Sequence, residues 1–356
     1  MKVGIIGLPQ TGKKTLFQIL TGNEITDPAK AFKPVPGTAD ILDSRFDRLV
    51  EMYAPKKEVR ARLDLVLLPK MEAETISKGD IFKDISDMDA VCHVVRAFED
   101  EAVYHAEGSV DALRDFDMVN SELVMHDQIF VEKRIERLSA MVKKIKDEDQ
   151  KKELVLMEKM LAHLEQELPL RLLELSEDEE KLIRSYPFIT LKKLVVAVNV
   201  AEDDLGNTGI LDAFKGSCDA LAIEAMLVSA KVEAEIAMLD SAEEKQAFLE
   251  DLGITSTALE SLTALCLKSL DLISFFTVGK DEVRQWLVRK AAKAPTAAGV
   301  IHSDLERGFI RAEVFKYDEL MELGSEAELK KNGKFYVEGK DYVVQDGDIL
   351  NIRFSV

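Results

Sequence analysis

The stretch that decides the fold lies near the amino terminus and reads Lys2-Val-Gly-Ile-Ile-Gly7-Leu-Pro-Gln-Thr-Gly12-Lys13-Lys14-Thr15. It begins as a short apolar run that ends at a glycine and continues into a helix-like segment. From Gly7 to Lys13 it has the G-x-x-x-x-G-K spacing of a phosphate-binding loop. In such loops backbone amides and the positive end of the helix face phosphate oxygens, and the lysine reaches the β- and γ-phosphates. The stretch therefore predicts a strand, a loop and a helix around a nucleotide; the alternative is a glycine turn with a surface lysine.

The position after Lys13 departs from this motif. The motif has Ser or Thr there, whose hydroxyl group ligates Mg²⁺, whereas this chain has Lys14. A second ammonium group repels a metal ion and removes a ligand, although it can itself neutralise phosphate. Thr15 offers a hydroxyl group one residue later, but it is rotated by roughly 100° around the helix. We therefore predict no protein ligand to a metal, and the motif does not decide whether Mg²⁺ accompanies the nucleotide.

Four further apolar runs have the length of buried parallel strands, at residues 63–68, 90–95, 194–200 and 225–229. Helical or irregular sequence separates them, which predicts a doubly wound α/β sheet. Between residues 111 and 183 the chain becomes charge-rich, with apolar residues at coiled-coil spacing, which predicts an inserted antiparallel helical hairpin. The alternative is an ordinary helical subdomain packed on the sheet.

The carboxy-terminal part has a different, β-rich pattern. Short apolar runs occur at residues 273–278, 310–314, 335–337, 342–344 and 349–354, with glycine-containing turns between them. They predict a separate small α+β domain. The predicted division is a nucleotide-binding domain at residues 1–112 and 188–272, a hairpin at residues 113–187 and the small domain at residues 273–356.

The composition, 47% hydrophobic and 32% charged over 356 residues, is typical of a globular protein with more than one domain. No run approaches the roughly 18–20 apolar residues that span a bilayer, and residues 1–20 have no export leader. We therefore expect a soluble, cytoplasmic protein with no membrane contact. Cys92, Cys218 and Cys266 lie far apart in apolar surroundings, which favours buried thiols over zinc ligands or disulfides. A net charge of −19 disfavours a chain that wraps nucleic acid as a whole.

Two more segments follow apolar strands, Asn199-Val-Ala-Glu202 and Ser229-Ala230-Lys231. With them and the phosphate-binding loop, the chain resembles the YchF subfamily of Obg-related P-loop proteins, and residues 275–356 are similar to the TGS domain of that family, a β-grasp fold. Guanine-specific relatives read the base with an N-K-x-D motif, in which this chain has Val200 and Glu202 in place of Lys and Asp. The resemblance implies a preference for ATP over GTP, since the longer carboxylate no longer fits the guanine edge. The alternative is that Asn199 only caps a turn.

The resemblance also implies a set of nucleotide-binding residues, and it assigns no catalytic residue. The predicted binding residues are Gly7, Pro9, Gln10, Thr11, Gly12, Lys13, Lys14, Thr15, Asn199, Glu202, Ser229, Ala230 and Lys231.

Two switch elements of the family are altered. Ala31 stands at the place of the switch I threonine, and the second switch, D-x-x-G in relatives, reads Leu67-Leu68-Pro69-Lys70. Together with Lys14, these changes remove groups that place magnesium and sense the γ-phosphate, and each such component affects the rate of phosphoryl transfer by orders of magnitude. We predict a nucleotide-binding protein whose hydrolysis is weak or lost. The alternatives are an active Mg-dependent ATPase and an interaction scaffold that binds no nucleotide.

The resemblance further implies a regulatory partner in translation, with the ribosome or RNA contacted through the hairpin and the TGS-like domain. A local basic cluster could touch RNA phosphate despite the acidic whole, or it could be a solvated helix face. Its members are Lys280, Arg284, Arg289, Lys290 and Lys293.

Overall fold

The computed structural model describes residues 1–25, 33–72, 75–76, 79–105, 107–143, 147–239, 241–254 and 256–355. They form two units. The first comprises Met1–Thr38 and Asp64–Leu262, and the second comprises Ala39–Leu63 and Thr263–Val356.

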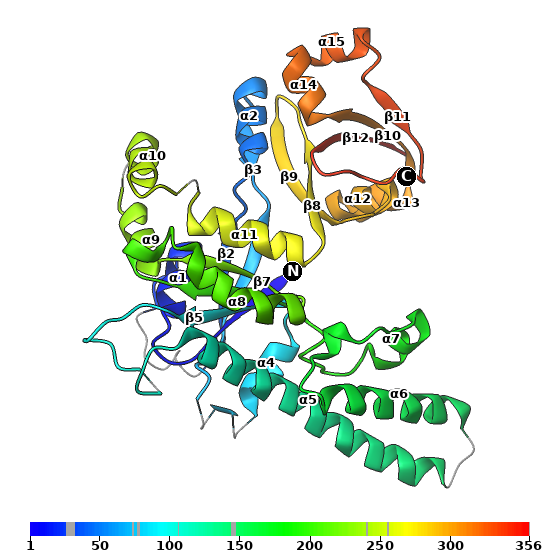
Figure 1. The fold of residues 1–356 in the computed structure, drawn as a ribbon. Helices are drawn as coiled ribbons and strands as arrows, with labels where there is room; N and C mark the ends of the chain where they lie inside the picture. Colours follow the sequence, from blue (N-terminus) through cyan, green and yellow to red (C-terminus); the bar gives the residue numbers. More distant parts are fainter. Residues whose placement is uncertain are drawn as a thin grey trace. The chain divides into compact units, whose positions relative to one another are not determined.

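The sheet of the first unit has the strand order β2-β4-β1-β5-β6-β7 (Figure 1). Strand β1 pairs in parallel with β4 and β5, and β6 pairs in parallel with β5 and β7. Every residue of β5 is buried, as expected of a central strand that is covered on both faces. The predicted doubly wound α/β sheet is therefore confirmed. The strands span Lys2–Ile6 (β1), Val35–Asp40 (β2), Arg62–Leu67 (β4), Ala90–Arg96 (β5), Lys193–Asn199 (β6) and Glu224–Val228 (β7).

Helices cover this sheet. Phe82 of α4, Phe116 of α5 and Phe214 of α8 join buried strand residues in one hydrophobic cluster. Helices α1 and α9 pack against each other, and they begin directly after β1 and β7. Both helices therefore start at the carboxyl ends of parallel strands, where α/β proteins bind their ligands. The helices span Lys13–Thr21 (α1), Asp80–Ser86 (α4), Thr208–Ala220 (α8), Ala230–Ala237 (α9), Ala242–Asp251 (α10) and Ala258–Ser269 (α11).

The predicted hairpin consists of α5 (Ala112–Val142) and α6 (Glu148–Leu164), followed by α7 (Glu177–Ile183). The start of α5 packs on the sheet through side chains such as Phe116. Its distal half instead forms a second hydrophobic cluster with α6, in which Val131 and Leu138 meet Met157 and Met160. The hairpin thus has a core of its own and extends from the sheet (Figure 1).

The second unit is built on a sheet with the order β11-β10-β12-β8-β9-β3. Adjacent residues Phe275 and Phe276 on β8 point to opposite faces and belong to two different hydrophobic clusters. The cluster around Phe275 includes α12, and the cluster around Phe276 includes Phe46 and Leu49 of α2. The strands span Lys57–Val59 (β3), Leu272–Thr277 (β8), Glu282–Arg289 (β9), Phe309–Lys316 (β10), Tyr336–Glu338 (β11) and Asp348–Phe354 (β12). The helices span Ser44–Tyr53 (α2), Ala294–Ile301 (α12), Ser303–Arg307 (α13), Tyr317–Leu323 (α14) and Glu326–Lys331 (α15).

The prediction of a strand at residues 342–344 is wrong. In this described part of the chain Val343 makes only an isolated bridge to Lys293. The reason is a local side chain, since the carboxylate of Asp348 accepts hydrogen bonds from the hydroxyl group of Tyr342 at 2.7 Å and from the amide of Gln345 at 2.9 Å. These bonds favour a turn over a ladder.

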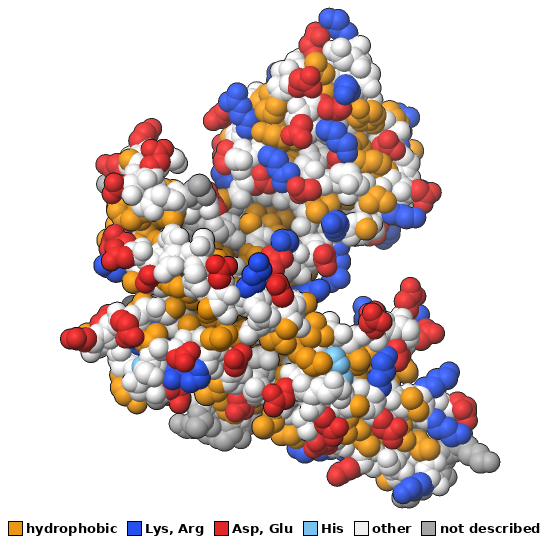
Figure 2. Space-filling view, in the orientation of Figure 1, with side chains coloured by type: hydrophobic (Ala, Val, Ile, Leu, Met, Phe, Trp, Pro, Cys, Tyr) orange, Lys and Arg blue, Asp and Glu red, His pale blue; other side chains and the backbone are white. Residues whose placement is uncertain are grey.

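The basic cluster is not a helix face. Arg284 and Arg289 lie on strand β9 at an odd spacing, so their side chains leave on opposite faces of the sheet. Arg284 stacks 4.0 Å from the ring of Trp286, and Lys293 forms an ion pair with Asp341 at 2.7 Å. On the face drawn in Figure 2, Lys and Arg side chains lie scattered among Asp and Glu.

The three cysteines are buried thiols, as predicted; they are Cys92, Cys218 and Cys266. Within the described ranges, no helix is long and apolar enough to cross a membrane.

Candidate phosphate-binding site

The loop between β1 and α1 requires both of its glycines. Gly7 has a φ of 151°, and a Cβ atom there would lie 2.4 Å from the carbonyl oxygen of Val94. Gly12 has a φ of 86°, and its Cβ atom would lie 2.2 Å from Nδ2 of Asn199. Side chains at either position would therefore clash and strain the backbone. The glycines allow the chain to turn tightly over the strand ends.

The lysine of the loop lies inside it. Lys13 is 8% exposed, and its Nζ donates a hydrogen bond to the carbonyl oxygen of Leu8 at 2.7 Å. The hydroxyl group of Thr11 donates to the same carbonyl oxygen at 3.2 Å. Gly12 is the N-cap of α1 and has no side chain to accept from the amides of the first turn, which remain available to an anion.

The remaining predicted loop residues lie at the surface. Pro9 is half-buried, and Gln10 is exposed with a φ of 60°. Lys14 and Thr15, on the first turn of α1, are exposed. Lys14 therefore places an exposed positive charge at the start of α1, next to Lys13.

The electrostatics of the loop favour an anionic ligand. The pKa of Lys13 is lowered from its ordinary value of 10.5 to about 8, chiefly by burial and also by the positive charge of Lys70, while Glu72 opposes the change. On the neighbouring strand β5, burial and the charge of Lys13 lower the pKa of His93 to about 3. His93 is therefore neutral at neutral pH, and Lys13 is a buried cation that an anionic ligand would stabilise.

Replacing the buried cation should stabilise the nucleotide-free protein. We expect Lys13→Met to raise the free energy of unfolding at neutral pH by about 2 kcal/mol, because the penalty of about 3 kcal/mol for the shifted ammonium group outweighs the lost hydrogen bond to Leu8. Between the folded pKa of about 8 and the ordinary 10.5, only the unfolded wild-type chain holds the proton, so wild-type stability rises with pH there. The advantage of the variant should therefore shrink above about pH 8.

Urea unfolding followed by far-UV circular dichroism measures this difference at several pH values. Lys83→Met, at an exposed position of α4, is the matched control, for which we expect almost no change. A difference between Lys13→Met and wild type that stays constant with pH would show that the buried charge is not its cause.

Asn199 joins the loop to the second half of the site. Its Nδ2 donates to the carbonyl oxygen of Thr11 at 3.0 Å, and its Oδ1 accepts from the amide of Ala230 at 3.0 Å. The side chain is 3% exposed, so both hydrogen bonds are shielded from water. Asn199 therefore does more than cap a local turn, because it links three segments that are far apart in the sequence.

The other predicted residues of this half lie beside Asn199. Glu202 and Lys231 form an ion pair at 3.8 Å across the two segments. Ser229 is 2% exposed, and its hydroxyl group has no hydrogen-bond partner within the described residues. The structure thus brings the predicted positions of three segments together at the carboxyl ends of β1, β6 and β7.

The segment after β4 contacts the phosphate-binding loop. The amide of Met71 donates to the carbonyl oxygen of Gly7 at 3.1 Å, and Nζ of Lys70 lies 2.9 Å from Oε2 of Glu72. Leu67 and Leu68, which precede it, are buried. Ala31, the predicted switch I position, lies outside the described residues.

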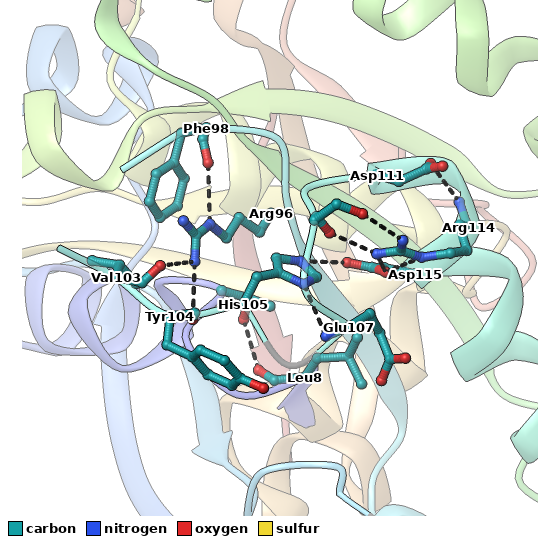
Figure 3. Close-up of polar contacts among 12 residues, drawn as sticks. Leu8, Arg96, Phe98, Val103, Tyr104, His105, Glu107, Asp111, Arg114 and Asp115 are labelled. Carbon is teal, nitrogen blue, oxygen red and sulfur yellow. Dashed lines mark hydrogen bonds and ion pairs between the residues drawn. The ribbon is translucent and has the colours of Figure 1, made fainter. Parts of the chain in front are cut away.

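A cluster that the sequence did not reveal holds the loop after β5 (Figure 3). The buried guanidinium group of Arg96 donates to the carbonyl oxygens of Phe98 at 3.1 Å and Val103 at 3.1 Å. Nε2 of His105 lies 2.9 Å from Oδ2 of the buried Asp115. Spacing could not show this cluster, because Arg96 contacts backbone carbonyls and nothing in the sequence indicates that His105 meets Asp115.

This loop also borders the phosphate-binding loop. The two share a mainly apolar cavity of about 670 Å³. The cavity is lined by Leu8, Pro9, Met71, Glu72, Ile76, Tyr104, Glu107, Met118, Val119 and Glu122.

Relatives of the chain are known over its full length. It is 39% identical to a protein of Bacillus subtilis (strain 168) named Ribosome-binding ATPase YchF, with 100% of both chains covered. It is 36% identical to Obg-like ATPase 1 of Caenorhabditis elegans, with 100% of this chain and 92% of the relative covered. Residues 272–355 match the family model YchF-GTPase_C, described as a protein of unknown function (DUF933).

Solved structures show the same architecture. The YchF GTPase of Schizosaccharomyces pombe is 30% identical, with a TM-score of 0.84 over 99% of this chain and 97% of that one. A GTP-binding protein of Pyrococcus horikoshii OT3 is 18% identical with a TM-score of 0.57 over 100% of both chains, and this likeness concerns the fold alone.

Proposed function

Because the chain belongs to the YchF family, we propose that it is a cytoplasmic ATP-binding regulatory protein that associates with the ribosome and hydrolyses ATP weakly or not at all. The proposal that the protein binds a nucleotide rests on the buried side chain of Asn199. Its hydrogen bonds join the phosphate loop at Thr11 to the segment after β7 at Ala230. The ribosomal half rests on the relative from Bacillus subtilis, whose name describes ribosome binding.

The preference for ATP over GTP follows from Glu202, which stands where guanine-specific relatives have an Asp that reads the base. A guanine base needs a carboxylate at a fixed distance to accept two hydrogen bonds. Glu202 is longer than Asp, and its carboxylate lies 3.8 Å from Nζ of Lys231. A carboxylate in this arrangement offers guanine little advantage over adenine.

Weak hydrolysis follows from the groups around the phosphate loop, which do not fit Mg²⁺. Lys14 stands where the motif has a hydroxyl ligand, and Leu67 places an apolar side chain at the end of β4. In the part of the chain that the structure describes, no group of three or more His, Cys, Asp or Glu side chains is arranged to hold a metal ion. These replacements remove protein groups that would place a cation on the phosphates.

His105, on the loop after β5, is held in place by two neighbours. His105 accepts a hydrogen bond at Nδ1 from the amide of Glu107 at 3.1 Å, and its Nε2 faces Asp115. His105 is therefore oriented by its neighbours, and an Nδ1 atom that already accepts a hydrogen bond is a poor general base in this arrangement. This supports a nucleotide that binds as a static ligand.

Calorimetric titration with ATP and with GTP tests whether the protein binds a nucleotide and which one it prefers. We expect saturable binding of ATP, weaker binding of GTP, and loss of at least about tenfold in affinity in Lys13→Met, because the lysine contacts charged phosphates. Lys83→Met is the control and should bind like wild type. Absence of saturable binding for both nucleotides would favour the interaction scaffold instead.

A further inference from the structure

Lys70 lies on a segment that is fixed against the phosphate loop. The amide of the next residue, Met71, donates to the carbonyl oxygen of Gly7 at 3.1 Å. The hydroxyl group of Thr75 donates to the carbonyl oxygen of Lys70 at 2.7 Å, and the amide of Glu72 donates to that hydroxyl group at 3.1 Å. Backbone contacts on both sides therefore hold Lys70 beside the loop.

The ammonium group of Lys70 belongs to the same electrostatic environment as Lys13. Its charge is the second cause, after burial, of the lowered pKa of Lys13. Its Nζ lies 2.9 Å from Oε2 of Glu72, and its side chain is 37% exposed. Since a partly exposed ion pair contributes little to stability, Lys70 can exchange Glu72 for a stronger anion at low cost.

On the described residues of the phosphate loop and of the segment after β4, the charge is opposite to that of a metal site. There Lys13, Lys14 and Lys70 supply three ammonium groups, and Glu72 supplies a carboxylate that already has a partner. Glu107 and Glu122 line the adjoining cavity. A divalent cation placed among these lysines would be repelled. A ligand that carries several negative charges would be attracted.

We propose that this site takes the nucleoside triphosphate free of metal, and that Lys70 leaves Glu72 to neutralise the terminal phosphate beside Lys13 and Lys14. The inference rests on the proposed function, because it names the form in which the same ligand binds. A metal-free triphosphate carries more negative charge than its magnesium complex, so it gains more from three ammonium groups. Glu72 makes the contact selective, since a diphosphate that ends short of Lys70 leaves the ion pair intact.

Titration of the full-length protein with ATP and with ADP, each in EDTA and in excess MgCl₂, tests this. We expect ATP to bind wild type at least as tightly in EDTA as in MgCl₂. Lys70→Met, which keeps the aliphatic stem, should lose about tenfold or more in ATP affinity, and its ADP affinity should stay within about twofold of wild type. Lys83→Met should change neither affinity.

A second variant gives the opposite sign and does not depend on how well Lys70→Met folds. Glu72→Gln removes the competing carboxylate, so ATP affinity in EDTA should rise. Unchanged or weaker ATP binding by Glu72→Gln would overturn the inference, as would equal losses of ATP and ADP in Lys70→Met. If wild type binds ATP in MgCl₂ only, the metal-free site is wrong and the proposed function stands. Absence of ATP binding in both solutions would overturn the two together.

Discussion

Measured under the same conditions, this chain should release phosphate from ATP at least about a thousandfold more slowly than the Bacillus subtilis relative that is named an ATPase. Phosphoryl transfer needs charge stabilisation on the γ-phosphate and an oriented water molecule. Here Lys14 and Leu67 stand where metal-positioning groups are required, and His105 is engaged with Asp115. Because these deficits concern the same transition state, their combined effect should far exceed the loss of one hydrogen bond.

Single-turnover assays with γ-labelled ATP, with protein in excess over nucleotide, measure this rate without dependence on product release. Lys13→Met supplies the background from contaminating enzymes, because its ATP affinity should be at least about tenfold lower. A magnesium-dependent release that is well above this background, and that Lys13→Met abolishes, would establish the active ATPase in place of the static ligand.

Truncation of Asp127 should be among the most destabilising single changes in the first unit. Asp127 on α5 is fully buried, and its carboxylate accepts hydrogen bonds from the amides of Ile189 at 3.1 Å and Thr190 at 2.8 Å and from the hydroxyl group of Thr190 at 2.6 Å. It thereby ties the hairpin to the segment that leads into β6. Asp127→Ala leaves three donors, two of them buried amides, without this partner, and we expect a loss of about 3–5 kcal/mol in the free energy of unfolding.

Urea unfolding followed by far-UV circular dichroism measures this loss, since the two long hairpin helices contribute a large share of that signal. Hydrogen exchange at the amides of Ile189 and Thr190 locates it, and both amides should exchange much faster in the variant. Asp127→Asn keeps one acceptor oxygen and should cost less than Asp127→Ala. If Asp127→Ala unfolds at the wild-type urea concentration, the three hydrogen bonds do not anchor the hairpin.

Short-range patterns predicted most of the first unit. The five apolar runs became β1, β4, β5, β6 and β7 because each is a short stretch dominated by apolar residues, and β5 and β6 are buried almost throughout. The heptad-like spacing likewise predicted α5 and α6, because side chains four residues apart meet on one helix face. Membership of the YchF family is confirmed by the full-length relatives.

The second unit was harder to predict. Strand β9 alternates charged and apolar residues, and its Arg284 and Arg289 suggested a cluster on one surface. Strand β3 is only three residues long. It forms because it pairs in parallel with β9, which is more than 220 residues away along the chain. The run at residues 342–344 had the composition of a strand, but hydrogen bonds to Asp348 hold it in a turn.

Local sequence was sufficient for the phosphate loop, the positions of the main strands along the chain, the hairpin and the departures at Lys14 and Leu67. Each of these depends on neighbours along the chain, through backbone geometry or the period of a helix or strand. The assembled molecule was needed to show that Asn199 joins Thr11 to Ala230, that Asp127 holds the hairpin, and that Lys70 stands beside Lys13. Those contacts link residues that only the packing of distant segments brings within reach of a hydrogen bond or a charge.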